Sequence, residues 1–217
     1  MKILALEFSS ETRSVALVEC GHVVGRAAES GGRHTRAFAL IDSALREAGW
    51  EQEAIECIAV GLGPGSYSGI RAAIALAQGW QLACRVQVLG VGSAECLAAQ
   101  AHNDGARGAV HFLIDAQRAE FYCARAELTE AAPRVETLHI IGLEEARSLP
   151  PGTLFVEPAL LQLLPNARAL CPDAAALGKL ASARGDFVSA EKLEPVYLRP
   201  ASFLKAPPPR VIPSLQQ

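Results

Sequence analysis

The residues best placed to do chemistry lie in a glycine-rich segment, residues 61–71, with the sequence GLGPGSYSGIR. Its closely spaced glycines stand between an apolar run, Ile55–Val60, and an Ala/Leu-rich run, Ile70–Ala83, which is the layout of a strand, a loop and a helix. Glycine tolerates positive φ and has no Cβ, so the amides of such a loop can turn toward a phosphate, a carboxylate or another backbone. Ser68 is expected to cap the helix. A tight turn whose glycines serve only backbone geometry fits this sequence equally well.

The common catalytic motifs do not match this loop. A nucleophile elbow needs G-x-S-x-G, whereas the chain has Gly63-Pro64-Gly65-Ser66, and no His/Asp order completes a triad. A Walker A loop would end in Gly-Lys-Ser or Gly-Lys-Thr, but this loop ends in Gly69-Ile70-Arg71. The five histidines have no metal-ligand spacing: His22, His34, His102, His111 and His139. The sequence therefore predicts no catalytic residue and no metal site.

A second set of polar residues could contact a ligand together with the glycine loop. Glu7 and Ser9 lie at the end of a predicted strand, and Asp115 ends another strand before a turn, where aspartate commonly bonds its own backbone. The candidate residues for loop contacts or nucleotide contacts are Glu7, Ser9, Gly63, Gly65, Ser66 and Asp115.

The elements that must position these residues follow from hydrophobic periodicity. Three strands joined by short turns begin the chain, and strands and helices then alternate, giving the order βββαβαβα. The predicted elements are strands over Lys2–Phe8, Thr12–Glu19, Val23–Ala28, Ile55–Gly61 and Val86–Gly90, and helices over Thr35–Ala48, Ile70–Ala83 and Ala94–Ala101.

The second half of the chain begins as the first does, with a predicted hairpin over Ala109–Asp115 and Glu120–Glu127. Thinner elements are expected near residues 152–156, 158–164 and 173–184, and Pro195 precedes a final strand that Tyr197 and Arg199 anchor. We therefore expect an α/β protein with an N-terminal subdomain over residues 1–100, a smaller C-terminal subdomain over 101–200 and a mobile proline-rich tail over 201–217.

Composition narrows the class of protein. The chain has 217 residues, of which 50% are hydrophobic and 20% charged, and this is typical of a globular protein. A net charge of −3 argues against a broad basic face that would hold nucleic acid without help. The six cysteines form no CxxC pair and no apolar run is long enough to cross a bilayer, so we expect a cytoplasmic protein with reduced thiols.

Several blocks in the same order resemble the bacterial TsaB (YeaZ) family. The blocks are Leu4–Ser10 with Ser14–Leu17, His34-Thr35, Gly63–Arg71, Ile114–Arg118 and Pro195–Arg199. The resemblance implies an actin-like/Hsp70-like (ASKHA, ribonuclease H-like) fold, made of two βββαβαβα-type halves with the second reduced. The resemblance also implies a role in making N6-threonylcarbamoyladenosine next to the anticodon of tRNA.

In that family the protein is not the catalyst. It dimerises with TsaD, which transfers the threonylcarbamoyl group, and a TsaE-like ATPase joins the complex. The resemblance therefore implies a non-catalytic subunit that activates TsaD, forms a homodimer when alone and meets tRNA only through the complex. The surface that this implies uses the Thr35 and Ile70 helices. Its residues are His34, Thr35, Phe38, Ile41, Ser68, Arg71, Ala72, Ala75, Leu76 and Gly79.

Some positions depart from the catalytic relatives. Those relatives carry two histidines four residues apart, where this chain has Ser93 and Leu97. Glu7 and Phe8 replace the usual Asp and Thr, so we expect no tightly bound cofactor and leave ATP or ADP for the interface of the complex. The alternative interpretation is a stand-alone actin-like phosphotransferase or hydrolase that binds ATP. The absent histidine pair disfavours a metalloprotease.

Overall fold

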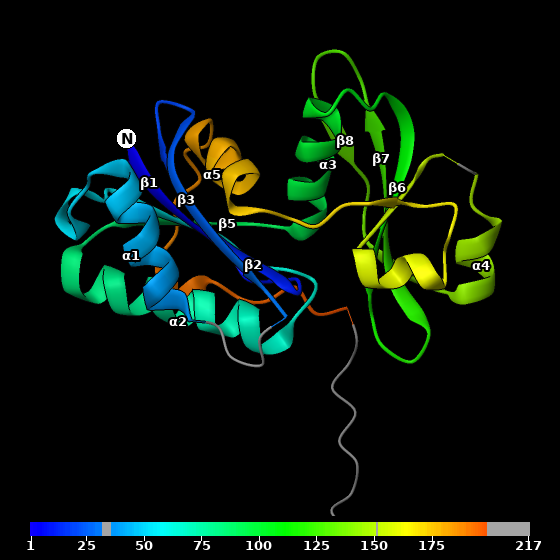
Figure 1. The fold of residues 1–217 in the computed structure, drawn as a ribbon, viewed down its shortest axis with the longest axis horizontal. Helices are drawn as coiled ribbons and strands as arrows, with labels where there is room; N and C mark the ends of the chain where they lie inside the picture. The colour runs from blue at the N-terminus through cyan, green and yellow to red at the C-terminus, as the bar shows by residue number, and fades with distance from the viewer. Residues whose placement is uncertain (32–35, 151, 199–217) are drawn as a thin grey trace, which may run out of the picture.

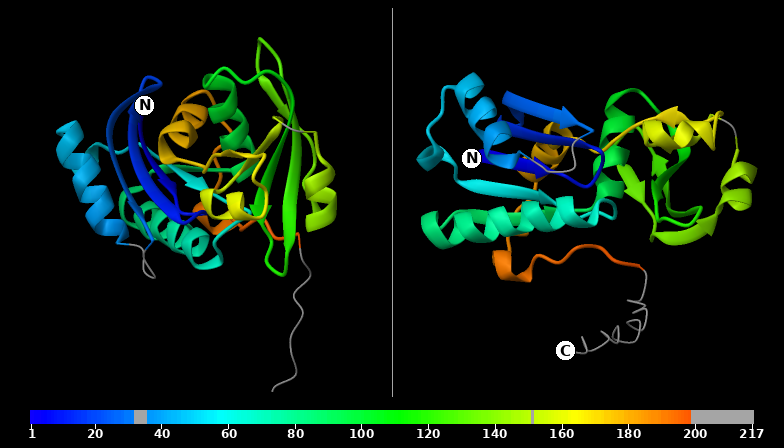
Figure 2. Two further views of the ribbon diagram at one scale, coloured as in Figure 1. Left: turned by 45° about the vertical axis from the view of Figure 1, so that its right-hand side comes forward. Right: turned by 60° about the horizontal axis from the view of Figure 1, so that its bottom comes forward.

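The computed structural model describes residues 1–31, 36–150 and 152–198. His34, Thr35, Arg199 and the predicted tail over 201–217 lie outside the described residues. The described chain folds into two β-sheets that stand side by side with helices around them (Figures 1 and 2).

The first sheet is built from the N-terminal strands in the order β3-β2-β1-β4-β5. β1 pairs antiparallel with β2 and parallel with β4, so that Leu4 lies beside both Leu17 and Ile58. Strand β1 is therefore the centre of the sheet. The strands are β1 (Lys2–Glu7), β2 (Thr12–Glu19), β3 (His22–Ser30), β4 (Cys57–Gly61) and β5 (Gln87–Val91).

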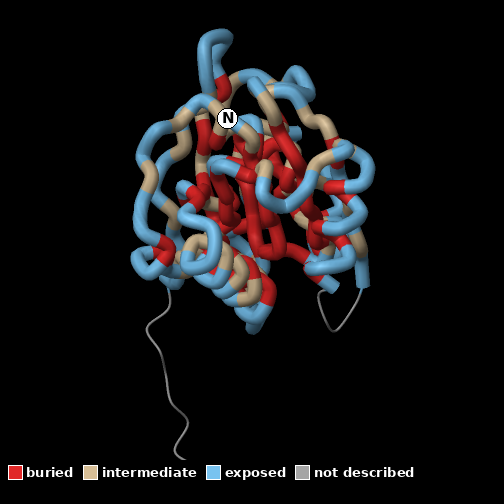
Figure 3. Tube along the Cα trace, turned by 90° about the vertical axis from the view of Figure 1, so that its left-hand side faces the viewer, coloured by how far each residue is buried: buried red, intermediate tan, exposed pale blue. Residues whose placement is uncertain are grey.

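Helices cover both faces of this sheet because successive side chains of β1 point to opposite sides. Leu4 and Leu6 pack with α1 (Ala37–Ala48) and α2 (Tyr67–Cys84), whereas Ile3 and Ala5 pack with α5 (Ala174–Ser182). Figure 3 shows that the buried residues lie mainly along the central strands, whereas the exposed residues lie mainly in the surrounding segments. The centre of the sheet is thus apolar on both sides.

The second sheet has the order β11-β10-β6-β7-β8, and β9 also pairs with β7. Its strands are β6 (Gly108–Asp115), β7 (Glu120–Leu128), β8 (Pro133–Val135), β9 (His139–Gly142), β10 (Leu154–Val156) and β11 (Arg168–Ala169). The remaining elements are α3 (Ser93–Asn103), α4 (Leu143–Ser148) and the short 3₁₀ helices η1 (Gln52–Ala54), η2 (Pro158–Gln162) and η3 (Ala190–Lys192).

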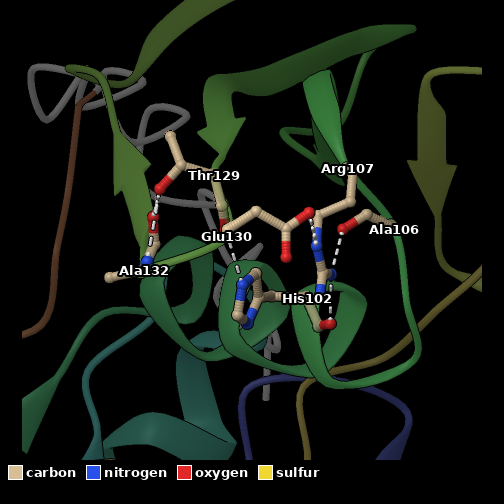
Figure 4. A network of polar contacts seen from close by, with 6 residues as sticks. All are labelled: His102, Ala106, Arg107, Thr129, Glu130 and Ala132. Atoms are coloured by element: carbon tan, nitrogen blue, oxygen red, sulfur yellow. Dashed lines mark hydrogen bonds and ion pairs between the residues drawn. The ribbon is translucent and has the colours of Figure 1, made fainter.

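Helix α3 belongs to both halves of the molecule. Leu97 and Ala98 pack with Phe112 of the second sheet, whereas Cys96 packs with the apolar cluster on the face of the first sheet that carries α5. The end of α3 is tied to the turn after β7, since a ring nitrogen of His102 is hydrogen-bonded to the carbonyl oxygen of Thr129 at 2.8 Å (Figure 4). Arg107 strengthens this connection by donating to the carbonyl oxygen of His102 and by pairing with Glu130.

The structure confirms the α/β class, the initial order βββαβαβα and the hairpin that opens the second half. The predicted boundaries at residues 100 and 200 stay predictions. Along the chain, however, α5 comes from the later half and packs on the first sheet.

Two local predictions were wrong. Helix α2 begins at Tyr67, and its cap is Ser66, whose hydroxyl oxygen accepts from the Gly69 amide, rather than Ser68. Residues 193–198 form no strand; instead, the amide of Val196 donates to the carbonyl oxygen of Leu62 at 2.9 Å. Which serine caps the helix depends on where the chain turns into α2. The presence of Ser66 and Ser68 in the sequence does not determine that position.

Two glycines in α2 give opposite predictions for replacement by alanine. A Cβ at Gly69 would lie 2.0 Å from the carbonyl oxygen of Phe8, whereas a Cβ at Gly79 would meet nothing within 4 Å. Gly69→Ala should therefore lower the free energy of unfolding by about 1–3 kcal/mol through overpacking. Gly79→Ala should raise it by about 0.5–1 kcal/mol, because alanine is the better helix former. Urea unfolding measures both, and equal effects would contradict this account of the loop.

Candidate functional site

The glycine loop packs directly against the turn between β1 and β2. The amide of Ser66 donates to the carbonyl oxygen of Ser9 at 2.6 Å, and a Cβ at Gly65 would lie 2.1 Å from that same oxygen. On the other side of the loop, the carbonyl oxygen of Gly63 accepts from the amide of Ser93 at the start of α3. The glycines therefore permit close backbone packing within the chain, which is the tight-turn interpretation of this sequence.

A cavity of about 670 Å³ lies where this loop faces the second sheet. Its walls come from the β1–β2 turn, the start of α2, the β6–β7 hairpin, the segment after β10 and residues 196–197. Four of the predicted contact residues share this cavity: Ser9, Gly65, Ser66 and Asp115. Glu7 and Gly63 are not among the lining residues.

Glu7 is fully buried behind the turn that forms one cavity wall. One carboxylate oxygen, Oε1, accepts from the amide of Ser9 at 2.8 Å, while Oε2 has no hydrogen-bond partner. A Cβ at Gly61 would lie 2.1 Å from Oε2, so the glycine at that position makes room for the longer acid. Burial raises the pKa of Glu7 to about 7, although hydrogen bonding by Ser9 opposes the shift. Glu7 is thus close to its titration point at neutral pH.

The neighbouring Phe8 has a structural role. It is fully buried in the apolar cluster with Leu6 and Ile70, on the side of the first sheet that carries α1 and α2. A threonine hydroxyl at this position would face that cluster. The departure at Phe8 is therefore explained by core packing.

Carboxylates dominate the charge of the cavity. Glu11, Asp115 and Glu157 line it, and Arg118 is the basic lining residue. The pKa of Glu157 is raised to about 7, mainly by burial and then by the negative charges of Glu11, Asp115 and Glu7. Such an environment disfavours the phosphate groups of a nucleotide. Sequence reasoning missed Glu11 and Glu157, because only the fold brings these distant acids to one cavity.

Aromatic side chains form the other missed feature of the cavity. Tyr67 and Tyr197 stack with their ring centroids 5.7 Å apart, and the Arg71 guanidinium lies 4.5 Å from the centroid of the Tyr67 ring. Tyr122 lines the same cavity from β7. Tyr197 belongs to one of the blocks of the family resemblance, but its proximity to Tyr67 depends on the return of the chain past Leu62, where the Val196 amide donates to the Leu62 carbonyl oxygen.

The residues predicted to meet a partner separate into four groups. Phe38, which is 71% exposed, lies on α1, and the exposed residues Ser68, Arg71, Ala75 and Gly79 lie on α2. Ala72 and Leu76 are half-buried against the core, and His34 and Thr35 are outside the described residues. Ile41 was assigned wrongly to this face, because it is buried in the core of the first sheet.

Leu82 extends the exposed face of α2. This residue is 89% exposed and lies three residues beyond Gly79 on the same helix. The helical spacing from Ala75 and Gly79 could have identified it in the sequence, since residues three and four apart share a face. The outer face of α2 thus combines small side chains with one large apolar side chain.

The positions that would carry the histidine pair are internal. The hydroxyl groups of Ser93 and Ser9 lie 3.0 Å apart, and Leu97 is buried in the cluster shared with the second sheet. Over residues 1–31, 36–150 and 152–198, no three His, Cys, Asp or Glu side chains gather in a way that could hold a metal ion. Within the same ranges, no helix has the length and apolar character that crossing a membrane requires.

Comparison with known proteins gives consistent matches. A family model described as TsaD, tRNA N6-adenosine threonylcarbamoyltransferase, matches residues 27–146. The tRNA threonylcarbamoyladenosine biosynthesis protein TsaB of Escherichia coli is 31% identical over 150 residues, which is 64% of this chain and 65% of that protein. TsaB of Haemophilus influenzae is 30% identical over 123 residues, 56% of this chain and 52% of that protein. The chain thus spans less than two thirds of these curated relatives.

Solved structures agree over a larger part of the chain. YeaZ from Pseudomonas aeruginosa superposes with a TM-score of 0.77 at 29% sequence identity, covering 91% of this chain and 99% of that structure. An uncharacterised protein from the same organism, described as similar to the peptidase YeaZ, gives the same values. The similarity therefore includes both sheets.

Glu7 and Glu157 predict how stability depends on pH. An acid whose pKa rises from 4.5 to about 7 on folding stabilises the folded state below pH 4.5 and loses that contribution as the pH rises through 7. For the fully buried Glu7 this is on the order of 3 kcal/mol. Urea unfolding of the parent protein and of Glu7→Gln at pH 5 and pH 8 should show a smaller loss of stability with pH in the variant.

Glu157→Gln should also reduce this slope, because the pKa of Glu157 is likewise raised to about 7. Glu53→Gln is the matched control, since Glu53 is exposed in η1. An identical pH dependence in Glu7→Gln and Glu53→Gln would show that Glu7 does not carry the titration.

Proposed function

The chain belongs to the TsaD family and, within it, to the TsaB (YeaZ) group, and on this basis we propose that it is a non-catalytic subunit of a tRNA threonylcarbamoyladenosine transferase complex. It would dimerise with a TsaD-like catalytic subunit and activate it in forming N6-threonylcarbamoyladenosine next to the anticodon of tRNA. The names of the Escherichia coli and Haemophilus influenzae relatives assign TsaB to the biosynthesis of threonylcarbamoyladenosine in tRNA.

The observation that carries the proposal is the outer face of α2. Ala75, Gly79 and Leu82 are exposed along this helix, and a Cβ at position 79 would meet nothing within 4 Å. Small side chains let a second helix approach closely, and Phe38 on α1 adds an exposed aromatic group on the same side of the sheet. Burying these apolar groups would favour association.

The interior of the chain supports a role without chemistry of its own. The glycine loop is packed against Ser9 and Phe8, and the cavity beside it is lined by carboxylates that repel phosphate groups. Ser93 and Leu97 stand where catalytic relatives have two histidines. We therefore assign catalysis to the partner, and place any ATP or ADP at the interface of the complex.

The other parts of the proposal follow from membership of the TsaB group. A TsaE-like ATPase would join the complex, tRNA would be met only through the complex, and the chain alone would form a homodimer through the same helices. We place the protein in the cytoplasm, where tRNA is modified. Docking would act by population shift: it would favour the catalytic subunit's competent arrangement, because this chain binds that arrangement more tightly.

Ala75→Arg and Gly79→Arg test the assigned surface. Each places a large charged side chain on the exposed face of α2 and should weaken binding to the TsaD-like subunit of the same organism by about 30-fold or more, roughly 2 kcal/mol. Size-exclusion chromatography with light scattering measures association, and a tRNA modification assay with the purified components measures activation. Both should fall together. Ala72 is a poorer site for this test, because it is half-buried against the core.

Ala131→Arg is the matched control, since Ala131 is exposed in the turn between β7 and β8 of the second sheet. It should leave pairing and modification unchanged. If Gly79→Arg still formed the complex fully, the assignment of this surface as the interface would be wrong. Turnover of ATP by the isolated chain, with no association, would instead favour the phosphotransferase alternative.

A further inference from the structure

All three tyrosines of the sequence line one cavity. Tyr67 begins α2, Tyr122 lies in β7 and Tyr197 follows η3, so three separate parts of the chain bring their aromatic rings to the same space. The rings are not sequestered in the core: 57% of Tyr67 and 46% of Tyr197 are exposed. A cavity of about 670 Å³ with such walls has the size and lining of a site for a small ligand or a side chain.

The side chains that line the cavity favour a ligand of positive charge. Aromatic rings attract cations through the negative potential of their faces, and one ring here already does so, because the Arg71 guanidinium lies 4.5 Å from the centroid of Tyr67. Glu11, Asp115 and Glu157 line the same cavity from three separate parts of the chain, against one basic lining residue, Arg118. Both features favour a positively charged group.

The spacing of the acids favours an organic cation over a metal ion. A divalent ion needs several oxygen ligands within about 2.0–2.6 Å of one point. Across the described part of the chain, no three acidic, histidine or cysteine side chains converge in that way. An alkylammonium or guanidinium group carries its donors on a longer skeleton and can stack on a ring while it reaches separate carboxylates.

From this geometry we propose that the cavity between the two sheets binds an alkylammonium or guanidinium group between the Tyr67–Tyr197 stack and the carboxylates of Glu11, Asp115 and Glu157. The group could belong to a free polyamine or to a basic side chain that a partner protein inserts, because the recognising chemistry is the same. The proposal goes beyond the subunit role and does not depend on it, since the site lies within one chain and is tested on that chain alone.

Calorimetry on the isolated protein tests the proposal with two probes, spermidine and N-acetylargininamide. At least one should bind with a Kd of ~1 mM or lower, while magnesium chloride at the same concentration should not. Binding of spermidine indicates a free polyamine as the source. Binding of N-acetylargininamide alone indicates a side chain of a partner.

Variants separate the two halves of the site. Glu11→Gln removes an exposed charge without disturbing the core and should weaken binding about fivefold, and Tyr197→Leu should do the same by removing a ring from the stack. Tyr197→Phe keeps the ring and should restore binding. Glu53→Gln changes an exposed acid in η1, which precedes β4, whereas the glycine loop follows that strand, and it should change nothing.

Three results would overturn the proposal. The first is the absence of binding by both probes up to about 10 mM. The second is equal binding in the parent protein, Glu11→Gln and Tyr197→Leu, which would indicate general attraction to an acidic protein. The third is tighter binding of magnesium than of either organic cation. None of these results bears on pairing with a TsaD-like subunit, which the α2 variants test separately.

Discussion

The close approach between the glycine loop and the β1–β2 turn is the constraint on which the rest of the site depends. Ser66 donates its amide to Ser9, and the missing side chains of Gly65 and Gly69 let the backbone of the loop reach the backbone of Ser9 and Phe8. This contact fixes where α2 begins. It thereby places Tyr67 at the edge of the cavity and directs the rest of α2 along the face of the sheet.

Glycine loops and helix N-termini often bind phosphate, because both present backbone amides. In this chain the loop uses its backbone groups for hydrogen bonds within the protein. The loop bonds to Ser9 and to the start of α3, while the space in front of it is lined by Glu11, Asp115 and Glu157. This strand–loop–helix layout therefore lies beside a cavity whose acidic residues disfavour phosphate.

The two sheets are connected through helices rather than through a single linker. Helix α3 packs on both, and α5 returns from the later part of the chain to cover the first sheet opposite α1 and α2. Helices α1 and α2 cover the other side of the first sheet, where η3 also packs against α2. The cavity and the proposed partner surface meet at the start of α2, where Tyr67 lines the cavity and Ser68 and Arg71 are exposed.

The sequence by itself determined the order of the elements, the α/β class and the family, because these depend on local patterns: the alternation in β1, the apolar period of α1 and the spacing of glycines after β4. It also located four residues of the cavity through strand ends and loop motifs. It did not determine which of two serines caps α2, that Ile41 faces the core, or that Glu11, Glu157 and Tyr197 meet. Those outcomes were decided by the tertiary structure. The pattern of a sequence shows which residues prefer burial or turns. Which distant segments lie side by side depends on how the two sheets pack around α3, the helix that they share.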